Sequence, residues 1–343
     1  MSRKHLFFGT TTYHLLLFGA ICTDIPKGDI KKLIFAPNNA CHLHFGKKLI
    51  NGNILKFSHY EIIDNTTKKV RPIRVLAKIY QSRCRAPVIG KSYSPDCIYT
   101  AKDRKPLPQS ILNSSKRANL IYVEDGMHAY SNNALEEETN WKETLKKVLY
   151  GSWYKSTNIY GTYGTYDAVA ALYPEYLRHD LVYQDTIQIK LDGLNQDIKK
   201  WRWEDEKEFN EIKNEIDVLF VLDHSSQLDK SKKTVAKIKN KIKSEVKEGG
   251  KVGIKYHPRE VKEYIHFEDS SNISILPSYI PSELILVSSA PKNVYGSSST
   301  FMISAKSLDK KLDIVAMIDD RKTLPSNIKR MYKSLGIQIV HTT

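Results

Sequence analysis

Three short motifs in this chain contain the residue types that proton transfer and phosphate binding require. They are E-D-G at residues 124–126, H-P at residues 257–258 and S-S-S at residues 297–299. A carboxylate can act as a general base and a histidine as a general acid. Small hydroxyl side chains at a helix N-terminus can add hydrogen bonds to a bound phosphate. The chemistry of these motifs depends on whether the fold brings them to suitable positions.

The H-P motif follows a predicted strand. Residues 251–256 alternate in the β pattern and then meet His257 and Pro258. Proline favours extended geometry in the preceding residue and removes a ladder donor, so the strand should end at His257. Strand ends of this kind open into the crevice where α/β sheets bind ligands. His257 is therefore a candidate partner for an acid or a phosphate; the alternative is a histidine that faces solvent or bonds a loop.

The E-D-G motif is also expected at a strand end. Residues 119–123 predict a strand that delivers Glu124 and Asp125 at its carboxyl end. One carboxylate can face the crevice, while the other bonds local backbone amides or caps the next element. The alternative interpretation is a simple turn in which Gly126 is left-handed.

The serine run and Glu283 each mark a predicted helix start. Residues 296–300, G-S-S-S-T, precede a helix whose N-terminus offers free N–H groups and a positive dipole end. An ordinary N-cap would explain only one of the serines. Pro281 opens another helix, in the first turn of which Glu283 lies. Together with His257 these residues predict one side of a nucleotide crevice, which Glu124 faces from another domain.

The elements that must position these residues alternate between strand and helix, which predicts parallel α/β sheets. Two Rossmann-like domains are expected, at residues 1–190 and 191–343. Strands are predicted at residues 5–9, 31–36, 119–123, 217–223, 251–256, 273–276 and, as the final strand, 313–318. Helices are predicted at residues 12–22, 136–151, 204–215, 230–247 and 301–308. Residues 285–288 fit either a helix or a buried strand, and residues 87–108 are predicted to form a long loop.

The chain is strongly basic. It has 343 residues and a formal net charge of +15, which favours anionic partners such as nucleic acid, lipid headgroups, sugar nucleotides or acidic polysaccharides. One cationic strip alternates with apolar residues and could face an extended anion, although such a run is also typical of a solvated face. This strip consists of Lys68, Lys69, Arg71, Arg74 and Lys78.

The spacings of the cysteines and histidines do not predict a metal site. The four cysteines are widely spaced and form no C-x-x-C pair, so we expect neither a zinc site nor a disulfide framework, and a cytoplasmic location. His42 and His44 would share a face of an extended segment, but no clear third ligand lies nearby, and two surface histidines in a loop are the alternative. No run of about eighteen apolar residues predicts a transmembrane helix.

The order of the motifs resembles that of bacterial sialyltransferases of the GT-B type. The resemblance rests on E-D-G at 124–126, H-P at 257–258 and S-S within 297–299, and the α/β layout extends over nearly the whole chain. It is greatest to the capsule polysialyltransferases, glycosyltransferase family 38, and next to the lipooligosaccharide sialyltransferases, family 52. This resemblance implies a GT-B fold, in which two Rossmann-like domains with parallel sheets face a central crevice.

The resemblance also implies the reaction. Sialic acid would pass from CMP-sialic acid to a sialylated or polysialic acid acceptor with inversion, without a metal or other cofactor. Glu124 would be the general base, with Asp125 as the second candidate, and His257 would act as the acid or hydrogen-bonded cation at the departing phosphate. The implied donor-binding residues are His257, Pro258, Glu283, Ser297, Ser298 and Ser299. The basic strip, with Lys69, Arg71 and Arg74, and His42 would serve the anionic glycan acceptor.

Partners and alternatives follow from the same comparison. The resemblance leaves room for peripheral association with the cytoplasmic face of the inner membrane or with a capsule assembly complex. Another GT-B capsule or lipopolysaccharide transferase with a different nucleotide sugar is the alternative enzyme. A basic nucleic-acid-binding protein is the alternative of a different class. No zinc-finger, RNA-recognition or helix-turn-helix signature supports that class, so nucleic acid is not an expected partner.

Overall fold

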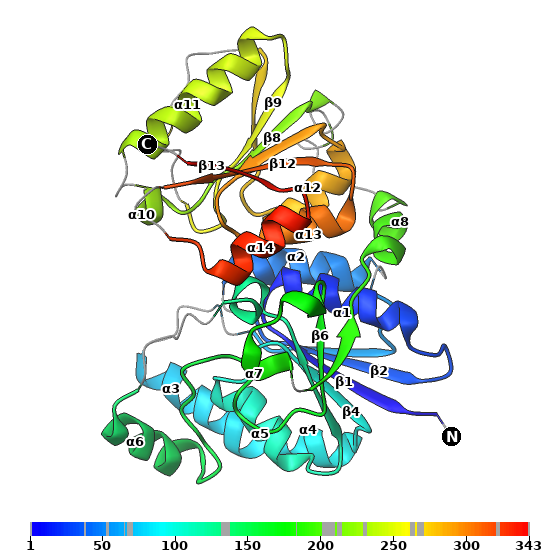
Figure 1. Cartoon of the computed structure of the whole chain (residues 1–343). Coiled ribbons are helices and arrows are strands. Elements are labelled where there is room, and N and C mark those ends of the chain that lie inside the picture. Colours follow the sequence, from blue (N-terminus) through cyan, green and yellow to red (C-terminus); the bar gives the residue numbers. More distant parts are fainter. Residues whose placement is uncertain are drawn as a thin grey trace. The chain divides into compact units, whose positions relative to one another are not determined.

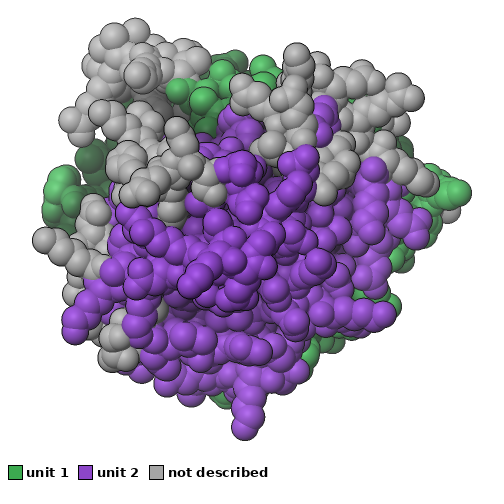
Figure 2. All heavy atoms as spheres, turned by 90° about the horizontal axis from the view of Figure 1, so that it is seen from above, with its two compact units in different colours: residues 1–190 green, residues 191–343 purple. Residues whose placement is uncertain are grey.

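The computed structural model divides the chain into two compact units, residues 1–190 and 191–343 (Figure 2). It describes residues 2–37, 39–52, 55–64, 66, 71–131, 138–182, 184–200, 210, 215–228, 232–260, 265, 271–319 and 323–341. For residues 71–74, 200, 227–228 and 232 it describes the backbone alone. Each unit is considered by itself below.

Unit 1 is built on a parallel sheet of seven strands in the order β3-β2-β1-β4-β5-β6-β7 (Figure 1). The strands are β1 (Lys4–Gly9), β2 (Ile30–Phe35), β3 (His59–Ile62), β4 (Cys97–Thr100), β5 (Asn119–Val123), β6 (Ala168–Ala171) and β7 (Asp185–Gln188). The strand order reverses between β1 and β4, which is the point where doubly wound sheets bind ligands beyond the carboxyl ends of their strands.

Helices connect these strands and cover the sheet. The α-helices are α1 (Thr12–Asp24), α2 (Ala40–Asn51), α3 (Arg71–Tyr80), α4 (Ala86–Tyr93), α5 (Pro106–Ser114), α6 (Asn140–Tyr150) and α7 (His179–Val182). Shorter turns are the π-helical η1 (Gln81–Arg85) and the 3-10 turns η2 (Gly126–Ala129) and η3 (Pro174–Tyr176).

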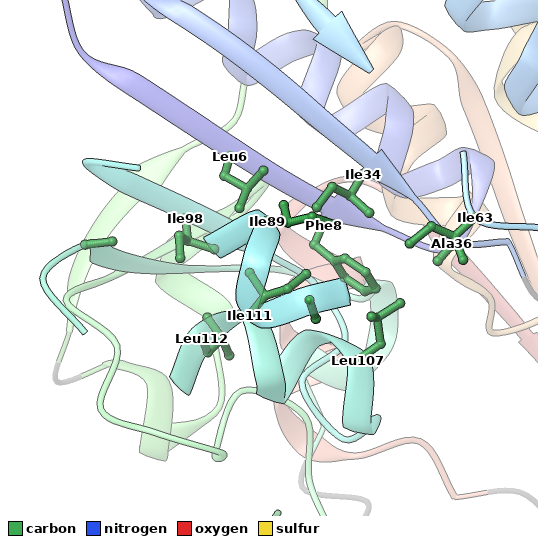
Figure 3. Close-up of a cluster of buried hydrophobic side chains, with 12 residues drawn as sticks. Leu6, Phe8, Ile34, Ala36, Ile63, Ile89, Ile98, Leu107, Ile111 and Leu112 are labelled. Atoms are coloured by element: carbon green, nitrogen blue, oxygen red, sulfur yellow. The ribbon is translucent and has the colours of Figure 1, made fainter. Parts of the chain in front are cut away.

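Successive side chains of β1 point to opposite faces of the unit 1 sheet, and they are buried on both faces. Leu6 and Phe8 point to one face, where they pack with Ile89 of α4 and Ile111 of α5 (Figure 3). Phe7 points to the other face, where its ring lies 5.3 Å from that of Phe18 in α1. A strand that is apolar on both sides is typical of a parallel sheet with helices on each face.

Unit 2 repeats this topology with six parallel strands in the order β10-β9-β8-β11-β12-β13. The strands are β8 (Val218–Val221), β9 (Val252–Lys255), β10 (Ile273–Leu276), β11 (Asn293–Gly296), β12 (Asp313–Ile318) and β13 (Gln338–His341). Its helices are α8 (Asp192–Lys200), α10 (Ser225–Leu228), α11 (Lys232–Lys247), α12 (Ser282–Ser289), α13 (Thr300–Leu308) and α14 (Ser326–Ser334). Its switch point lies between β8 and β11.

The pattern of α11 shows why unit 2 folds in this way. Ile238 and Ile242, four residues apart on one helix face, are buried against Phe220 of β8 and Ile254 of β9. Lysines occupy much of the remaining helix surface. The sheet is thus covered by a helix whose apolar side the sequence specifies.

Several sequence predictions are wrong in detail. Residues 87–108 are not a loop: they contain most of α4, all of β4 and the start of α5. Pro87, Pro106 and Pro108 occupy first helical turns, where an N–H is not needed. Because β13 follows β12, β12 is not the final strand. Residues 285–288, which fit either a helix or a strand by sequence, are helical within α12. Residues 136–137 and most of 204–215 lie outside the described residues.

Close packing of α2 on β2 gives a first prediction. A Cβ atom on Gly46 would lie 2.2 Å from Phe35 Cε1, and Phe35 is fully buried. Alanine favours a helix over glycine by about 1 kcal/mol, but overpacking a core costs about 1–3 kcal/mol. We expect Gly46→Ala to lower the free energy of unfolding measured by urea titration. Gly28→Ala, which meets nothing within 4 Å, is the control, and equal loss in both variants would contradict this packing argument.

Candidate active site

Glu124 follows β5 and is fully buried. Its Oε1 accepts a hydrogen bond from the Tyr13 hydroxyl, and its Oε2 accepts from the Tyr130 hydroxyl and from Leu172 N–H at 2.9 Å. Burial raises the pKa of Glu124 to about 7, although these three hydrogen bonds favour the ionised form. The carboxylate is therefore held on every side by the protein and not presented to solvent.

Asp125 is the carboxylate of the pair that reaches the surface. Its Oδ1 lies 2.8 Å from His14 Nε2, its Oδ2 lies 3.6 Å from Lys102 Nζ, and 12% of its side chain is exposed. Burial alone would raise the pKa of Asp125, but the hydrogen bond from His14 and the positive charge of Lys102 hold it below its ordinary value. Asp125 is thus ionised at neutral pH and available to accept a proton.

His14 links Asp125 to the end of β1. Thr10 N–H donates to His14 Nδ1 at 3.2 Å, so the hydrogen-bond network places the proton of the neutral ring on Nε2, facing Asp125. Burial lowers the pKa of His14 and keeps it neutral. His14 lies in the apolar helix α1, where sequence reasoning gave it no role.

A buried arginine fixes the segment that follows Asp125. Arg178 donates to His128 O at 2.6 Å and to Tyr160 O, and its Nε lies 2.7 Å from Asp180 Oδ1. Gly126 begins this segment with φ of 62°, a left-handed conformation that favours glycine. The turn expected at the E-D-G motif is therefore present, and it orients Asp125.

Cationic groups surround Tyr160 beside this turn. Lys102 Nζ lies 5.8 Å and the Arg104 guanidinium 5.7 Å from the centre of the Tyr160 ring, and the His128 ring meets it edge-on at 5.5 Å. These side chains are partly exposed. Sequence reasoning missed them because Lys102 and Arg104 fall in the segment predicted to be a loop.

The predicted acceptor residues are only partly described. His42 lies near the start of α2, and its Nδ1 is 3.3 Å from Thr12 Oγ1 at the start of α1, so it lies at the carboxyl edge of the sheet. His42 and His44 belong to a helix, not to an extended segment or a loop, so they do not share a face. Lys69 lies outside the described residues, and so do the side chains of Arg71 and Arg74 in α3.

His257 follows β9 in unit 2, as predicted, and is partly exposed. Its Nδ1 accepts a hydrogen bond from Arg259 N–H at 3.1 Å, which leaves the proton of the neutral ring on Nε2. Burial, followed by the nearby positive charges of Arg259 and Lys255, lowers the pKa of His257 to about 4. His257 is therefore a neutral hydrogen-bond donor at pH 7, not an imidazolium. Pro258 follows it and is also partly exposed.

A second histidine accompanies His257. His224 follows β8, and its ring lies 5.5 Å from that of His257 in an edge-to-face arrangement. Its Nε2 is 3.5 Å from Glu260 Oε1, and Glu260 also accepts a hydrogen bond from Ser225 N–H. The sequence signal for His224 is its position just after the apolar run of residues 217–223.

The serine run lies where it was predicted, between β11 and α13. Ser297, Ser298 and Ser299 are each partly exposed, and Ser299 is the N-cap of α13 but makes no side-chain capping bond. The Ser297 hydroxyl oxygen is buried and has no hydrogen-bond partner within the described residues. Unused hydroxyls and N–H groups at a helix N-terminus are suited to binding a phosphate.

Glu283 lies in the first turn of α12, also as predicted, but it is buried. Its Oε1 accepts a hydrogen bond from Ser304 Oγ at 2.9 Å, which joins α12 to α13. Burial raises the pKa of Glu283. The assignment of Glu283 to the donor-binding residues stays a prediction.

Solved structures resemble the fold. A UDP-GlcNAc 2-epimerase from Neisseria meningitidis bound to UDP-GlcNAc has a TM-score of 0.58 at 10% identity, covering 99% of this chain and 88% of that one. The UDP-GlcNAc 2-epimerase of Methanocaldococcus jannaschii has a TM-score of 0.56 at 11% identity, covering 99% of this chain and 89% of that one. The α/β-galactoside α-2,3-sialyltransferase of Photobacterium phosphoreum has a TM-score of 0.50 at 13% identity, covering 99% of this chain and 98% of that one. These likenesses show the predicted α/β fold of the GT-B type.

The family follows from the sequence. Residues 96–316 match the family described as alpha-2,8-polysialyltransferase (POLYST), and the chain belongs to it. No curated protein matches the chain. The protein is therefore a glycosyltransferase that transfers sialic acid, as the motif order predicted, and it uses a nucleotide-sugar donor and a glycan acceptor.

Two further features concern only the part of the chain that is described. No helix there is long and apolar enough to cross a membrane. No group of three or more histidine, cysteine, aspartate or glutamate side chains there could hold a metal ion. Independence from metals stays a prediction from the resemblance.

The burial of Glu124 predicts a pH-dependent stability. Since the pKa of Glu124 is about 7 in the fold but 4.5 ordinarily, the folded state binds more protons than the unfolded state between these values. Stability from this group is therefore lost as pH rises through that window, on the order of 3 kcal/mol in all. Glu124→Gln should abolish this loss. Urea titrations of both proteins at about pH 5 and about pH 8 measure the change in the free energy of unfolding between the two pH values. The same change in the wild type and in Glu124→Gln would contradict this prediction.

Proposed function

We propose that the chain transfers sialic acid from CMP-sialic acid to a sialylated or polysialic acid acceptor, with inversion and without a metal. The observation that carries this proposal is the division of chemistry between two strand-end sites. Unit 1 holds an ionised carboxylate beside cationic groups, whereas unit 2 holds a histidine N–H and a helix N-terminus. The first site suits an anionic acceptor that must lose a proton, and the second suits a phosphate that departs.

Asp125 is the proposed general base. The acceptor hydroxyl attacks the anomeric carbon, its proton passes to Asp125, and the bond to the CMP phosphate breaks with its electron pair on that phosphate oxygen. Glu124, the first candidate for the base by sequence, is fully buried, and both of its carboxylate oxygens accept hydrogen bonds. We therefore propose that Glu124 holds the side chains of Tyr13 and Tyr130 in position. The structure thus supports reversing the order of the two carboxylates.

His257 and the serines are proposed to bind the donor. The Nε2–H of neutral His257 donates to the phosphate, and Ser297, Ser298 and Ser299 add hydrogen bonds with the N-terminus of α13. Fixed donors aimed at a developing charge are an effective form of electrostatic catalysis. Glu283 would bind ribose hydroxyls if its carboxylate exchanged Ser304 for the ligand.

Acceptor binding and location complete the proposal. Lys69, Arg71, Arg74 and His42 are proposed to contact an anionic glycan, and the net charge of +15 favours such a polymer. The same charge would support peripheral association with anionic lipids of the inner membrane or with a capsule assembly complex.

Incubation with a panel of sugar nucleotides tests the donor. CMP-sialic acid with sialylated oligosaccharides should give longer products and release CMP. Turnover with another cytidine or uridine sugar, and none with CMP-sialic acid, would favour the alternative GT-B transferase.

The two carboxylates give a paired prediction for activity. Asp125→Asn should reduce kcat/KM by about a hundredfold or more, because an amide cannot accept the proton. Glu124→Gln keeps a buried group of the same size and should retain far more activity. The initial rate of CMP release from folded, purified variants measures both. The opposite ranking would restore Glu124 as the base.

Phosphate binding at His257 gives a prediction for NMR. In the free protein His257 should titrate near pH 4, since its pKa is lowered to about 4 by burial and nearby cations. Bound CMP would bring a negative phosphate to the ring and raise the pKa. Histidine chemical shifts followed through a pH titration, with and without CMP, measure the change. The expected result is an upward shift, and an unchanged pKa at saturating CMP would remove His257 from the donor site.

A further inference from the structure

Unit 1 contains a pocket at its topological switch point, and of its lining residues only Lys78 belongs to the basic strip that was assigned to the acceptor. It has a volume of about 130 Å³ and lies beyond the carboxyl ends of β1 and β2, beside the start of α5. Its lining includes Phe8, Thr10, Lys78, Gln81, Lys105 and Leu107. A larger cavity of about 740 Å³ is lined by Asp96 and Ala118, at the amino ends of β4 and β5, the edge opposite to Asp125.

Thr10 brings an unsatisfied hydroxyl to this pocket. The residue is 4% exposed, and its Oγ1 has no hydrogen-bond partner in the described part of the chain. Buried polar groups are almost always paired, because an unpaired one loses its bonds to water without replacement. A ligand oxygen in the pocket would supply the missing partner.

Two lysines give the pocket its charge. Neither Lys78 nor Lys105 forms an ion pair with a carboxylate among the described residues. Burial lowers the pKa of Lys105, although part of its side chain reaches solvent, and the charges of Lys78, Lys146 and Lys102 lower it further. Cations that repel one another in the free protein would be stabilised by a bound anion.

The pocket is connected to the proposed base through one side chain. Thr10 N–H donates to His14 Nδ1, while Nε2 of the same imidazole lies 2.8 Å from Asp125 Oδ1. Lys102, which pairs with Asp125, and Lys105 belong to the same segment after β4. His14 thus links a residue of the pocket to Asp125, so an anionic group of the acceptor is a suitable occupant of the pocket.

We propose that this pocket binds a carboxylate of the acceptor glycan, with Lys78, Lys105 and the Thr10 hydroxyl as its partners. This inference rests on the proposed function, which makes the acceptor an acidic sugar. Phe8 and Leu107 supply an apolar wall for the carbon skeleton beside the carboxylate. The pocket thereby selects acceptors whose terminal sugar is acidic.

The experiment compares two acceptors that differ in one group. The first is a sialylated oligosaccharide, and the second is the same compound with the carboxylate of its terminal sugar converted to a carboxamide. Wild-type enzyme should show a KM about tenfold or more higher for the amide, the usual effect of losing a hydrogen bond to a charged group. In Lys105→Gln and Lys78→Gln the ratio of the two KM values should fall toward one.

Thr10→Val isolates the hydroxyl. Valine has a similar shape, and no described hydrogen bond of the Thr10 hydroxyl is lost, so the variant should be at least as stable as wild type in urea. The KM for the acidic acceptor should nevertheless rise. Lys27→Gln, an exposed lysine before β2 at the opposite edge of the sheet, is the control and should leave the KM ratio at its wild-type value.

Calorimetric binding of both acceptors, without donor, separates the two proposals. If the wild type binds the acid more tightly than the amide and Lys105→Gln does not, the pocket stands even when CMP-sialic acid gives no turnover. If the preference for the acid is the same in wild type, Lys105→Gln, Lys78→Gln and Thr10→Val, the inference is overturned whatever the activity. A phosphate site would be shown instead if inorganic phosphate displaced the acidic acceptor from the enzyme at a lower concentration than the free acidic sugar does. That result would also overturn the inference.

Discussion

The hydrogen bond between His14 and Asp125 is the interaction on which the account of unit 1 depends. It joins the first turn of α1, which follows β1, to the end of β5, and these two strands are separated by β4 in the sheet. A carboxylate as enclosed as Asp125 would tend toward the protonated form without such partners. Thr10 fixes the tautomer of His14, and Arg178 fixes the turn after Asp125. The base is thus ionised and oriented by residues from separate parts of the chain.

The two units use one topology for different chemistry. Both sheets reverse strand order in the same way, so each has a switch point at which loops from two central strands meet. In unit 1 these loops carry Thr10 and Lys102, beside a carboxylate. In unit 2 they carry His224 and the serines, beside His257. The fold provides the position, and the side chains at the strand ends decide whether an acceptor or a phosphate is bound.

The sequence predicts those features that have a local signal. Proline after His257 and the apolar run before Glu124 mark strand ends, and Asp313–Ile318 has the bounds expected for β12. The partners of Asp125 have no such signal: His14 lies in an apolar helix, and Lys102 lies in a segment where prolines resembled a loop. Which of Glu124 and Asp125 is buried depends on Tyr13 and Tyr130, whose approach is set by tertiary packing.

The pH dependence of kcat/KM in His14→Leu tests whether Asp125, held by His14, accepts the proton of the acceptor. Leucine fills the buried site but cannot donate to Asp125, so the pKa of this carboxylate should be higher in the variant than in the wild type. We expect that, as pH is lowered, kcat/KM falls at a higher pH in the variant than in the wild type, while the variant retains its fold. An acid limb at the same pH in both proteins would show that Asp125, held by His14, is not the group that accepts the proton.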